Sequence, residues 1–198
     1  MRRYWAAATV LVLIGVLSSA FYWLEFYAAQ SDTRADSQTT TVSSQLELLR
    51  TRGNAKLTVF VPGDGALEAA LGRELRAELA KSPLFAEVAF QSGRAGTVAG
   101  DVLVVDLGRC QMTWTGVYSH ADVDASAAYS TAGSVDWRRQ EPVQLHFDGP
   151  TVVVHEKLTL EDGSRGLMSL NGYSAELGRK LAREIARSLL AELQKQVA

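Results

Sequence analysis

The distribution of apolar and polar residues divides the chain into three parts. In the first part, residues 1–29, the stretch from Tyr4 to Leu24 contains no charged side chain. The second part, residues 30–45, is rich in Ser, Thr, Asp and Gln and contains one aliphatic residue besides Ala. The third part, residues 46–198, has the mixed pattern of a folded domain. We therefore predict an apolar segment, a polar linker that cannot bury a core face, and one domain.

The apolar segment is long enough to cross a membrane. As an α-helix, residues 4–24 span about 31 Å, which matches the hydrocarbon core of a bilayer. Arg2 and Arg3 precede the segment, so the positive-inside rule places the N-terminus in the cytoplasm. Aromatic residues lie at both ends, as in the two aromatic belts of a spanning helix. We therefore predict a single-pass signal-anchor in the plasma membrane, followed by an extracytoplasmic domain.

A cleaved secretory signal is the alternative for this segment. Its apolar region is Trp5 to Leu17, and the small residues Ser18 and Ala20 provide a cleavage site. Cleavage after Ala20 leaves the apolar residues 21–24 as an exposed N-terminus, which favours the uncleaved anchor. Both interpretations export the domain.

The first half of the domain begins with a predicted strand and a predicted helix. Residues 57–61 (LTVFV) form an apolar, β-branched run that ends at a Pro-Gly-Asp-Gly turn, which is typical of a buried strand. Leucine then recurs every fourth residue over residues 67–79, and Pro83 stops the pattern. This spacing predicts one amphipathic helix.

Beyond this helix the pattern favours strands. Residues 85–90 and 101–107 read as two strands, separated by a glycine-rich loop over residues 92–100. From residue 110 to residue 160, apolar and polar positions alternate, which predicts a meander of about four antiparallel strands with one wet face. Gly149-Pro150 lies between two of these strands, which would form a hairpin if these two residues make a two-residue turn.

A second amphipathic helix ends the chain, with Ser174 as its predicted N-cap. Its apolar residues fall on one stripe: Leu177, Leu181, Ile185, Leu189 and Leu193. Each predicted helix therefore has one apolar face. The predicted fold class is α+β, with an N-terminal transmembrane helix followed by a mixed or antiparallel sheet that has two helices packed on one face.

Composition narrows the range of partners. The chain has 198 residues, a net charge of -2 and one cysteine. This charge balance lacks the basic excess of nucleic-acid-binding proteins, so we predict no nucleic-acid partner. The single Cys110 allows no internal disulfide, so the core alone must stabilise an exported domain.

Two short motifs resemble nucleotide or nucleophile sites, and each fails at a required position. Residues 63–65 (GDG) begin a dinucleotide fingerprint, but Glu68 occupies the third glycine position, where its carboxylate repels a pyrophosphate. Residues 172–174 (GYS) open a helix like a nucleophile elbow, but no Asp or His follows Ser174 to complete a triad. We therefore predict no catalytic residues and no cofactor.

The meander contains candidate metal ligands. His120, Asp122 and Asp124 share one face of a regular strand, and His146 and His155 become diagonal neighbours if Gly149-Pro150 closes a hairpin. Imidazole and carboxylate groups suit zinc and other divalent cations. The same alternation is also typical of any solvent-exposed strand face, and no HExxH or CxxC motif accompanies it.

Two further groups of residues are candidates for interaction. The meander holds a concentration of Trp and Tyr, which are enriched at interfaces: Trp114, Tyr118, Tyr129 and Trp137. The last helix carries a basic stripe of Arg179, Arg183 and Arg187 that suits lipid headgroups or an acidic partner. Interleaved glutamates on the same helix are also typical of a solvated face.

The order of these elements resembles a group of bacterial envelope proteins. The matching parts are the strand at 57–61, the following leucine-rich helix, the segment 82–88 (SPLFAEV), the strand at 101–105 and the final helix. This layout is similar to the N-terminal domain of TolB and to outer-membrane lipoproteins of the LptE and curli-secretion type. The resemblance implies a noncatalytic module that assists assembly or transport at the envelope. The N-terminal segment lacks the lipid-bearing Cys of those lipoproteins, which favours the inner membrane.

These observations predict a membrane-anchored, extracytoplasmic binding or scaffolding subunit of an envelope assembly or transport complex. An envelope protein is its expected partner, and self-association is left open. Two other functions also stay open: a metal-dependent hydrolase that uses the meander histidines and aspartates, and a carrier of a lipid or small apolar ligand between the sheet and the helices.

Overall fold

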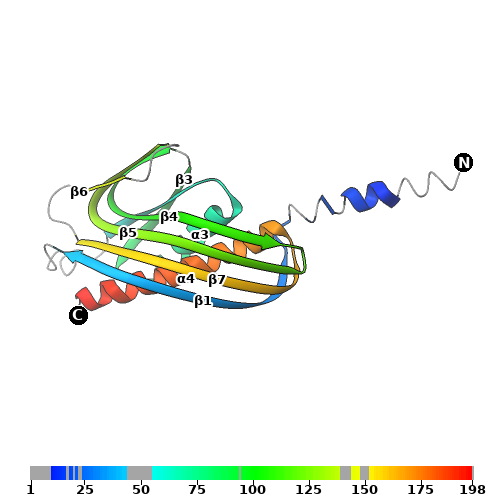
Figure 1. Ribbon diagram of the computed structural model, residues 1–198. Coiled ribbons are helices and arrows are strands. Elements are labelled where there is room, and N and C mark those ends of the chain that lie inside the picture. Colours follow the sequence, from blue (N-terminus) through cyan, green and yellow to red (C-terminus); the bar gives the residue numbers. More distant parts are fainter. Residues whose placement is uncertain are drawn as a thin grey trace, which may run out of the picture.

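A curved sheet with two helices behind it dominates the computed structural model (Figure 1). The structure describes residues 10–16, 18–19, 21, 24–43, 55–93, 95–138, 144–147 and 152–197. Within these residues the elements run in the order β1 (Tyr27–Ser43), β2 (Ala55–Pro62), α3 (Ala66–Leu79), β3 (Phe85–Gly93), β4 (Ala95–Trp114), β5 (Tyr118–Arg138), β6 (Gln144–Phe147), β7 (Val152–Met168) and α4 (Leu170–Val197).

The strands form one mixed sheet. Its order is β1-β7-β5-β4-β2-β3, and β6 pairs with β5 outside this path. β2 runs parallel to β3 and β4, whereas β1, β7, β5 and β4 are antiparallel neighbours. The parallel pairing of β2 with β3 requires a crossover connection, which α3 supplies. The predicted α+β class with a mixed sheet is therefore confirmed.

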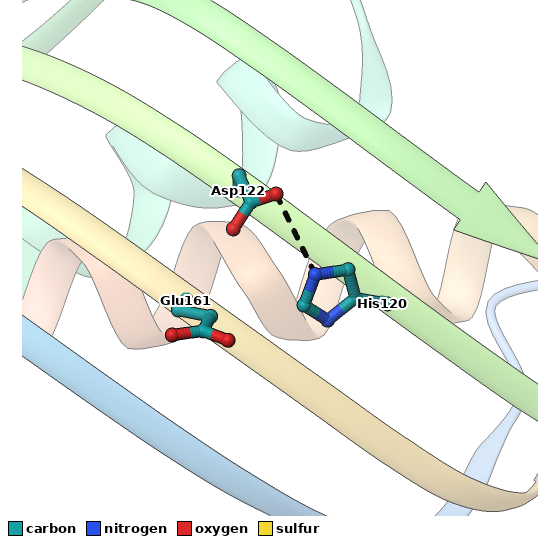
Figure 2. A group of neighbouring side chains, drawn as sticks. All are labelled: His120, Asp122 and Glu161. Atoms are coloured by element: carbon teal, nitrogen blue, oxygen red, sulfur yellow. Dashed lines mark ion pairs between the residues drawn. The ribbon is translucent and has the colours of Figure 1, made fainter.

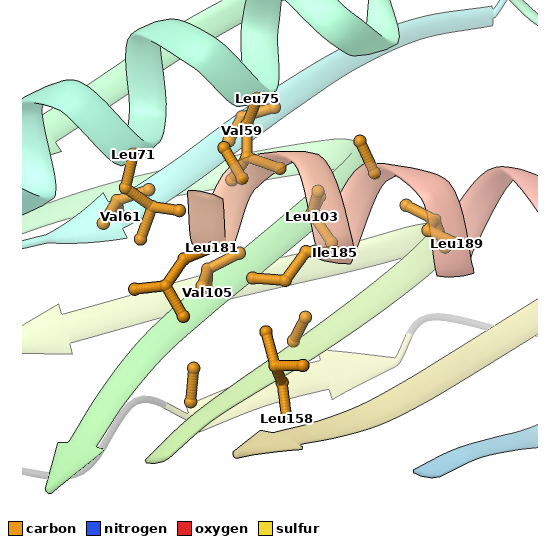
Figure 3. Packing of buried hydrophobic residues seen from close by; sticks show 14 of the residues in the cluster. Val59, Val61, Leu71, Leu75, Leu103, Val105, Leu158, Leu181, Ile185 and Leu189 are labelled. Atoms are coloured by element: carbon orange, nitrogen blue, oxygen red, sulfur yellow. The ribbon is translucent and has the colours of Figure 1, made fainter. Parts of the chain in front are cut away.

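Helices α3 and α4 pack against each other on one side of the sheet. Their backbones approach closely at Gly178 of α4, which has no side chain to separate them. A Cβ added there would lie only 2.5 Å from the Leu67 carbonyl oxygen of α3. The core between the helices and the sheet includes Val59, Val61, Leu71, Leu75, Leu103, Val105, Leu158, Leu181, Ile185 and Leu189 (Figure 3). These side chains occupy the space in which a carrier of apolar ligands would need its groove.

The leucine spacing locates both helices, but the predicted cap of α4 is wrong. α3 begins at Ala66, one residue before the predicted start. α4 begins at Leu170, and its cap is Ser169, whose hydroxyl accepts a hydrogen bond from the Gly172 N–H at 2.9 Å. Ser169 also accepts the N–H of Phe26 at 3.0 Å, so the start of α4 is tied to the start of β1. Ser174 lies buried inside the helix.

Residues 27–43 form strand β1, so the prediction of a polar linker over residues 30–45 is wrong for this part. The prediction assumed that a segment must bury apolar side chains to be ordered. β1 instead pairs with β7 along its whole length, from Tyr27 opposite Met168 to Ser43 opposite Val152. Its threonines add side-chain hydrogen bonds: Thr33 donates to Asp162 of the neighbouring strand β7 at 2.6 Å, and Thr41 donates to Glu192 of α4 at 2.8 Å.

The predicted glycine-rich loop over residues 92–100 is largely strand. Residues 95–100 belong to β4 and pair with residues 133–138 of β5. Gly100 has φ of +103°, and the register shifts between Gly100 and Val102, so a glycine bulge bends the strand without ending it. β4 and β5 therefore form one long hairpin, which turns at residues 115–117.

The strands on either side of Gly149-Pro150 do not pair as the hairpin that a two-residue turn would make. β6 pairs with residues 133–136 of β5, and β7 pairs with residues 118–130 of the same strand, both in the antiparallel sense. β6 and β7 therefore follow each other along β5 and do not face each other. Residues 148–151 between them lie outside the described part of the chain.

The N-terminal apolar segment is described only in part. Of the predicted anchor over residues 4–24, residues 10–16, 18–19 and 21 are helical in the structure. Among the described residues, no helix combines the length and the apolar character needed to cross a membrane.

Glu156 is an acidic side chain enclosed between β7 and α4. The residue is 2% exposed, and its Oε1 has no hydrogen-bond partner. Burial raises the pKa of Glu156 from 4.5 to about 7; a hydrogen bond with Ser188 opposes this rise, and the nearby Glu184 adds to it. As pH rises, the unfolded chain loses the Glu156 proton near pH 4.5, whereas the folded protein keeps it up to about pH 7.

We predict that replacing Glu156 with Gln removes a pH dependence of stability. Between pH 4.5 and about 7 the folded state binds more protons at this site than the unfolded state, so the free energy of unfolding falls as pH rises. At about 1.4 kcal/mol per pKa unit, the loss is about 2 to 3 kcal/mol by pH 7. Urea unfolding at a series of pH values measures it. The exposed Glu161→Gln serves as control, and equal pH slopes in wild type and Glu156→Gln would contradict the account.

Candidate functional site

The outer face of the sheet, opposite the helices, carries the predicted metal ligands of β5. Ala121, Val123 and Ala125 are buried toward the helices, whereas His120, Asp122 and Asp124 alternate with them and are partly exposed on the other face. The regular strand inferred from the sequence is therefore present. The structure separates its three polar residues into two groups.

His120 and Asp122 form a cluster with Glu161 of β7 (Figure 2). His120 Nε2 lies 3.5 Å from Asp122 Oδ2. Glu161 is the cross-strand partner of Asp122, and each of the three residues offers a ligand atom within 4.8 Å of the others. Glu161 was missed at the sequence level, because only the register of β5 against β7 shows that it faces Asp122.

A shallow hollow of about 230 Å³ adjoins this cluster. It is lined by Asp32, Arg34, His120, Glu161 and Gly163. Gly163 pairs with His120 on one side and with Asp32 on the other. A Cβ added at Gly163 would meet no atom within 4 Å, so the missing side chain is what leaves the hollow open.

The residues of the cluster are suitable ligands for a divalent cation. One imidazole and two carboxylates provide nitrogen and oxygen ligands that suit zinc or manganese. Arg34 pairs in register with Glu161 and brings a positive charge to the same hollow. Arg34 therefore places a positive charge beside the cluster, which acts against cation binding there.

The other predicted ligands do not join the cluster. Asp124 lies 3.5 Å from the guanidinium of Arg109 and accepts a hydrogen bond from Thr159 at 3.2 Å. His155 pairs with Ala128, and His146 pairs with Ser134, six residues farther along β5. At about 3.4 Å per residue, these two histidines are roughly 20 Å apart and do not form a pair.

The aromatic residues predicted to form an interaction surface differ in how far they are exposed. Tyr129 is a core residue that makes an edge-to-face contact with Phe85, with ring centroids 6.2 Å apart. Trp114 is partly buried and donates its indole N–H to the Met168 carbonyl at 3.2 Å. Tyr118 is exposed, whereas the side chain of Trp137 lies outside the described residues.

The basic stripe of α4 is engaged in ion pairs. Arg179 pairs with Glu176 at 2.8 Å, and Arg187 pairs with Glu184. Arg183 reaches across to Glu74 of α3 at 3.1 Å. The three arginines therefore neutralise neighbouring glutamates, as on a solvated helix face, and Arg183 also connects the two helices.

A buried ion pair was also missed at the sequence level. The side chain of Asp162 on β7 is fully buried and pairs with Lys180 of α4. Burial acts to raise the pKa of Asp162, but hydrogen bonds from Lys180 and Thr33 outweigh it and hold the pKa below its usual range. Asp162 is therefore charged and joins β1, β7 and α4.

Comparisons with known proteins give no family. No protein-family description matches the chain, and no characterised protein sequence matches it. Two solved structures of PelC dodecamers from Paraburkholderia phytofirmans show 14% and 13% identity, and each match covers 74% of this chain and 94% of the PelC chain with a TM-score of 0.31. That TM-score is too low to support an argument about this chain.

Proposed function

We propose that this protein is a membrane-anchored, extracytoplasmic binding or scaffolding subunit of a cell-envelope assembly or transport complex. Residues 4–24 form its single-pass anchor in the inner membrane, with the N-terminus in the cytoplasm and the domain in the periplasm. The uncharged sequence of this segment and the two arginines before it support the anchor and its orientation. The domain acts by binding and not by catalysis.

The observation that carries this proposal is the open edge of the sheet at β1. Helices α3 and α4 cover one face of the sheet, but β1 is the last strand of the described sheet order, and residues 30–40 are exposed. An uncovered edge strand presents backbone N–H and C=O groups to which another chain can add a strand. β1 begins directly after the predicted anchor, so this edge lies close to the membrane where envelope components meet.

The location of the domain can be tested at Cys110, which is exposed and is the one cysteine of the chain. We predict that a membrane-impermeant maleimide labels Cys110 in cells whose outer barrier is opened and whose inner membrane is intact. Labelling is done near neutral pH with a long incubation, because partial burial and the nearby Glu68 raise the pKa of this thiol and slow its reaction, whereas a more alkaline pH would let the maleimide react with lysine amines.

The Cys110→Ser variant is the matched control and takes up no label. The protein is also expected to stay in the membrane pellet after alkaline extraction, with an N-terminus that retains residues 4–24. Labelling that requires lysis of the inner membrane would contradict the proposed location. Release by alkali would contradict the anchor.

A second candidate function is binding of a divalent cation on the outer sheet face. The observation that favours it is the convergence of His120, Asp122 and Glu161. The metal-dependent hydrolase considered from the sequence would then use His120 and Asp122 as expected, with Glu161 as the third ligand in place of Asp124.

The cation site can be tested by calorimetric titration of the purified full-length chain with zinc and manganese. His120→Ala and Glu161→Ala are each expected to weaken binding by 10-fold or more, as loss of a ligand does, because each removes one of three ligands. Asp124→Ala is the control, since Asp124 pairs with Arg109 outside the cluster. Absence of binding by the wild type, or an equal effect of Asp124→Ala, would rule this candidate out.

A further inference from the structure

Strand β1 has the features of an assembly edge. It contains 17 residues, whereas strands of globular proteins usually contain about 3 to 10. Its pairing with β7 has no register shift, and the strand contains neither Pro nor Lys. Bulges, prolines and charged side chains, lysine above all, are the devices by which edge strands usually avoid pairing with other chains. β1 has no bulge, Pro or Lys, and its charged residues are confined to Asp32, Arg34 and Asp36 near the middle of the strand.

The charges of β1 are arranged to complement a second copy of the same strand. When two identical strands pair antiparallel about a twofold axis, the residue numbers of facing partners have a constant sum. Full overlap of β1 places Tyr27 opposite Ser43 and centres the axis on Ala35. In this register Arg34 of each copy faces Asp36 of the other, so the overlap that pairs every residue also forms two opposite-charge pairs.

Neighbouring registers are less favourable. Moving the axis to Arg34 places the two arginines opposite each other and sets Asp32 against Asp36, so like charges face each other. Moving the axis to Thr33 pairs Arg34 with Asp32 but leaves residues 40–43 without partners. An axis that falls between two residues would pair each residue that points toward the helices with one that points to the outer face. A continuous sheet does not allow such a pairing, because facing residues lie on the same side of the sheet.

We propose that two copies of this chain associate through β1, antiparallel and in the full-length register centred on Ala35, to form one continuous sheet. This inference rests on the proposed binding function and names its partner as a second copy. An isologous contact of this kind closes on itself and buries both β1 edges. Pairing of β1 with the opposite sheet edge, the nine-residue β3, would leave much of β1 open and would continue into fibres.

The register also sets the orientation of the dimer on a membrane. The twofold axis of such a pair stands normal to the sheet, so the two copies of Tyr27 lie 16 residues apart at opposite ends of the interface. This separation is about 50 Å at 3.3 Å per residue. Both predicted anchors enter one membrane when the sheet lies parallel to its surface.

Disulfide cross-linking at the twofold axis tests the register. In a Cys110→Ser background, Ala35→Cys places two thiols opposite each other, and mild oxidation of membranes that contain the full-length protein should give a covalent dimer. Ala28→Cys is the matched control, because the two copies of Ala28 lie about 45 Å apart in this register. Thr33→Cys reports the register centred on Thr33. Efficient cross-linking at Ala28 or Thr33, or none at Ala35, would overturn the proposal.

A charge swap tests the ion pairs with the same readout. Arg34→Asp alone sets an aspartate at position 34 of each copy opposite Asp36 of the other and should reduce the Ala35→Cys dimer yield severalfold. Asp36→Arg alone sets arginines opposite each other in the same two pairs and should do the same. The double variant Arg34→Asp/Asp36→Arg restores opposite charges and should recover the dimer. A double variant that cross-links no better than the single variants would contradict the charge pairing.

These outcomes separate the two proposals. If Cys110 of the wild type is labelled from outside but Ala35→Cys gives no cross-link, the exported binding domain is supported and the β1 dimer is ruled out. If Ala35→Cys cross-links but Cys110 is labelled only after lysis of the inner membrane, the dimer is supported and the exported location is ruled out.

Discussion

The buried ion pair between Asp162 and Lys180 fixes the register on which the sheet depends. Asp162 also accepts hydrogen bonds from Thr33 of β1 and from Ser164, so a single carboxylate joins two strands and α4. A slip of β7 by one residue would turn this charge to the outer face and turn the buried Leu158 and Leu160 to solvent. Separating the pair inside the protein would leave a buried charge without a partner, which costs about 3 to 5 kcal/mol.

The same register positions the two candidate surfaces. Because Asp162 points toward the helices, Glu161 and Gly163 on either side of it point outward, where they complete the His120 cluster and open the hollow beside it. The β1–β7 register in turn brings Arg34 opposite Glu161 and leaves the other edge of β1 without a strand in the described sheet. The outer face and the open edge are therefore two consequences of one strand alignment.

Features that depend on local periodicity could be predicted from the sequence, and features that depend on pairing could not. The leucine spacing located α3, and the alternation of Ala121, Val123 and Ala125 identified the inner face of β5. Glu161 was missed because its proximity to Asp122 is set by strands that are distant in sequence. β1 was read as a linker because an edge strand can be held by backbone pairing and threonine hydrogen bonds without apolar burial. The residues next to a strand in the sequence contain almost no information about which distant strand it pairs with, or in which register.

Amide hydrogen exchange over residues 27–43 shows whether this segment is an ordered edge strand that another chain can bind. If it is, every second amide, the set that points toward β7, is protected in the isolated chain. Conditions that favour association should then protect the alternate set. Exchange of all these amides at the rate of an unstructured peptide would show instead that the segment is the linker its composition suggests, with no edge strand to bind a partner.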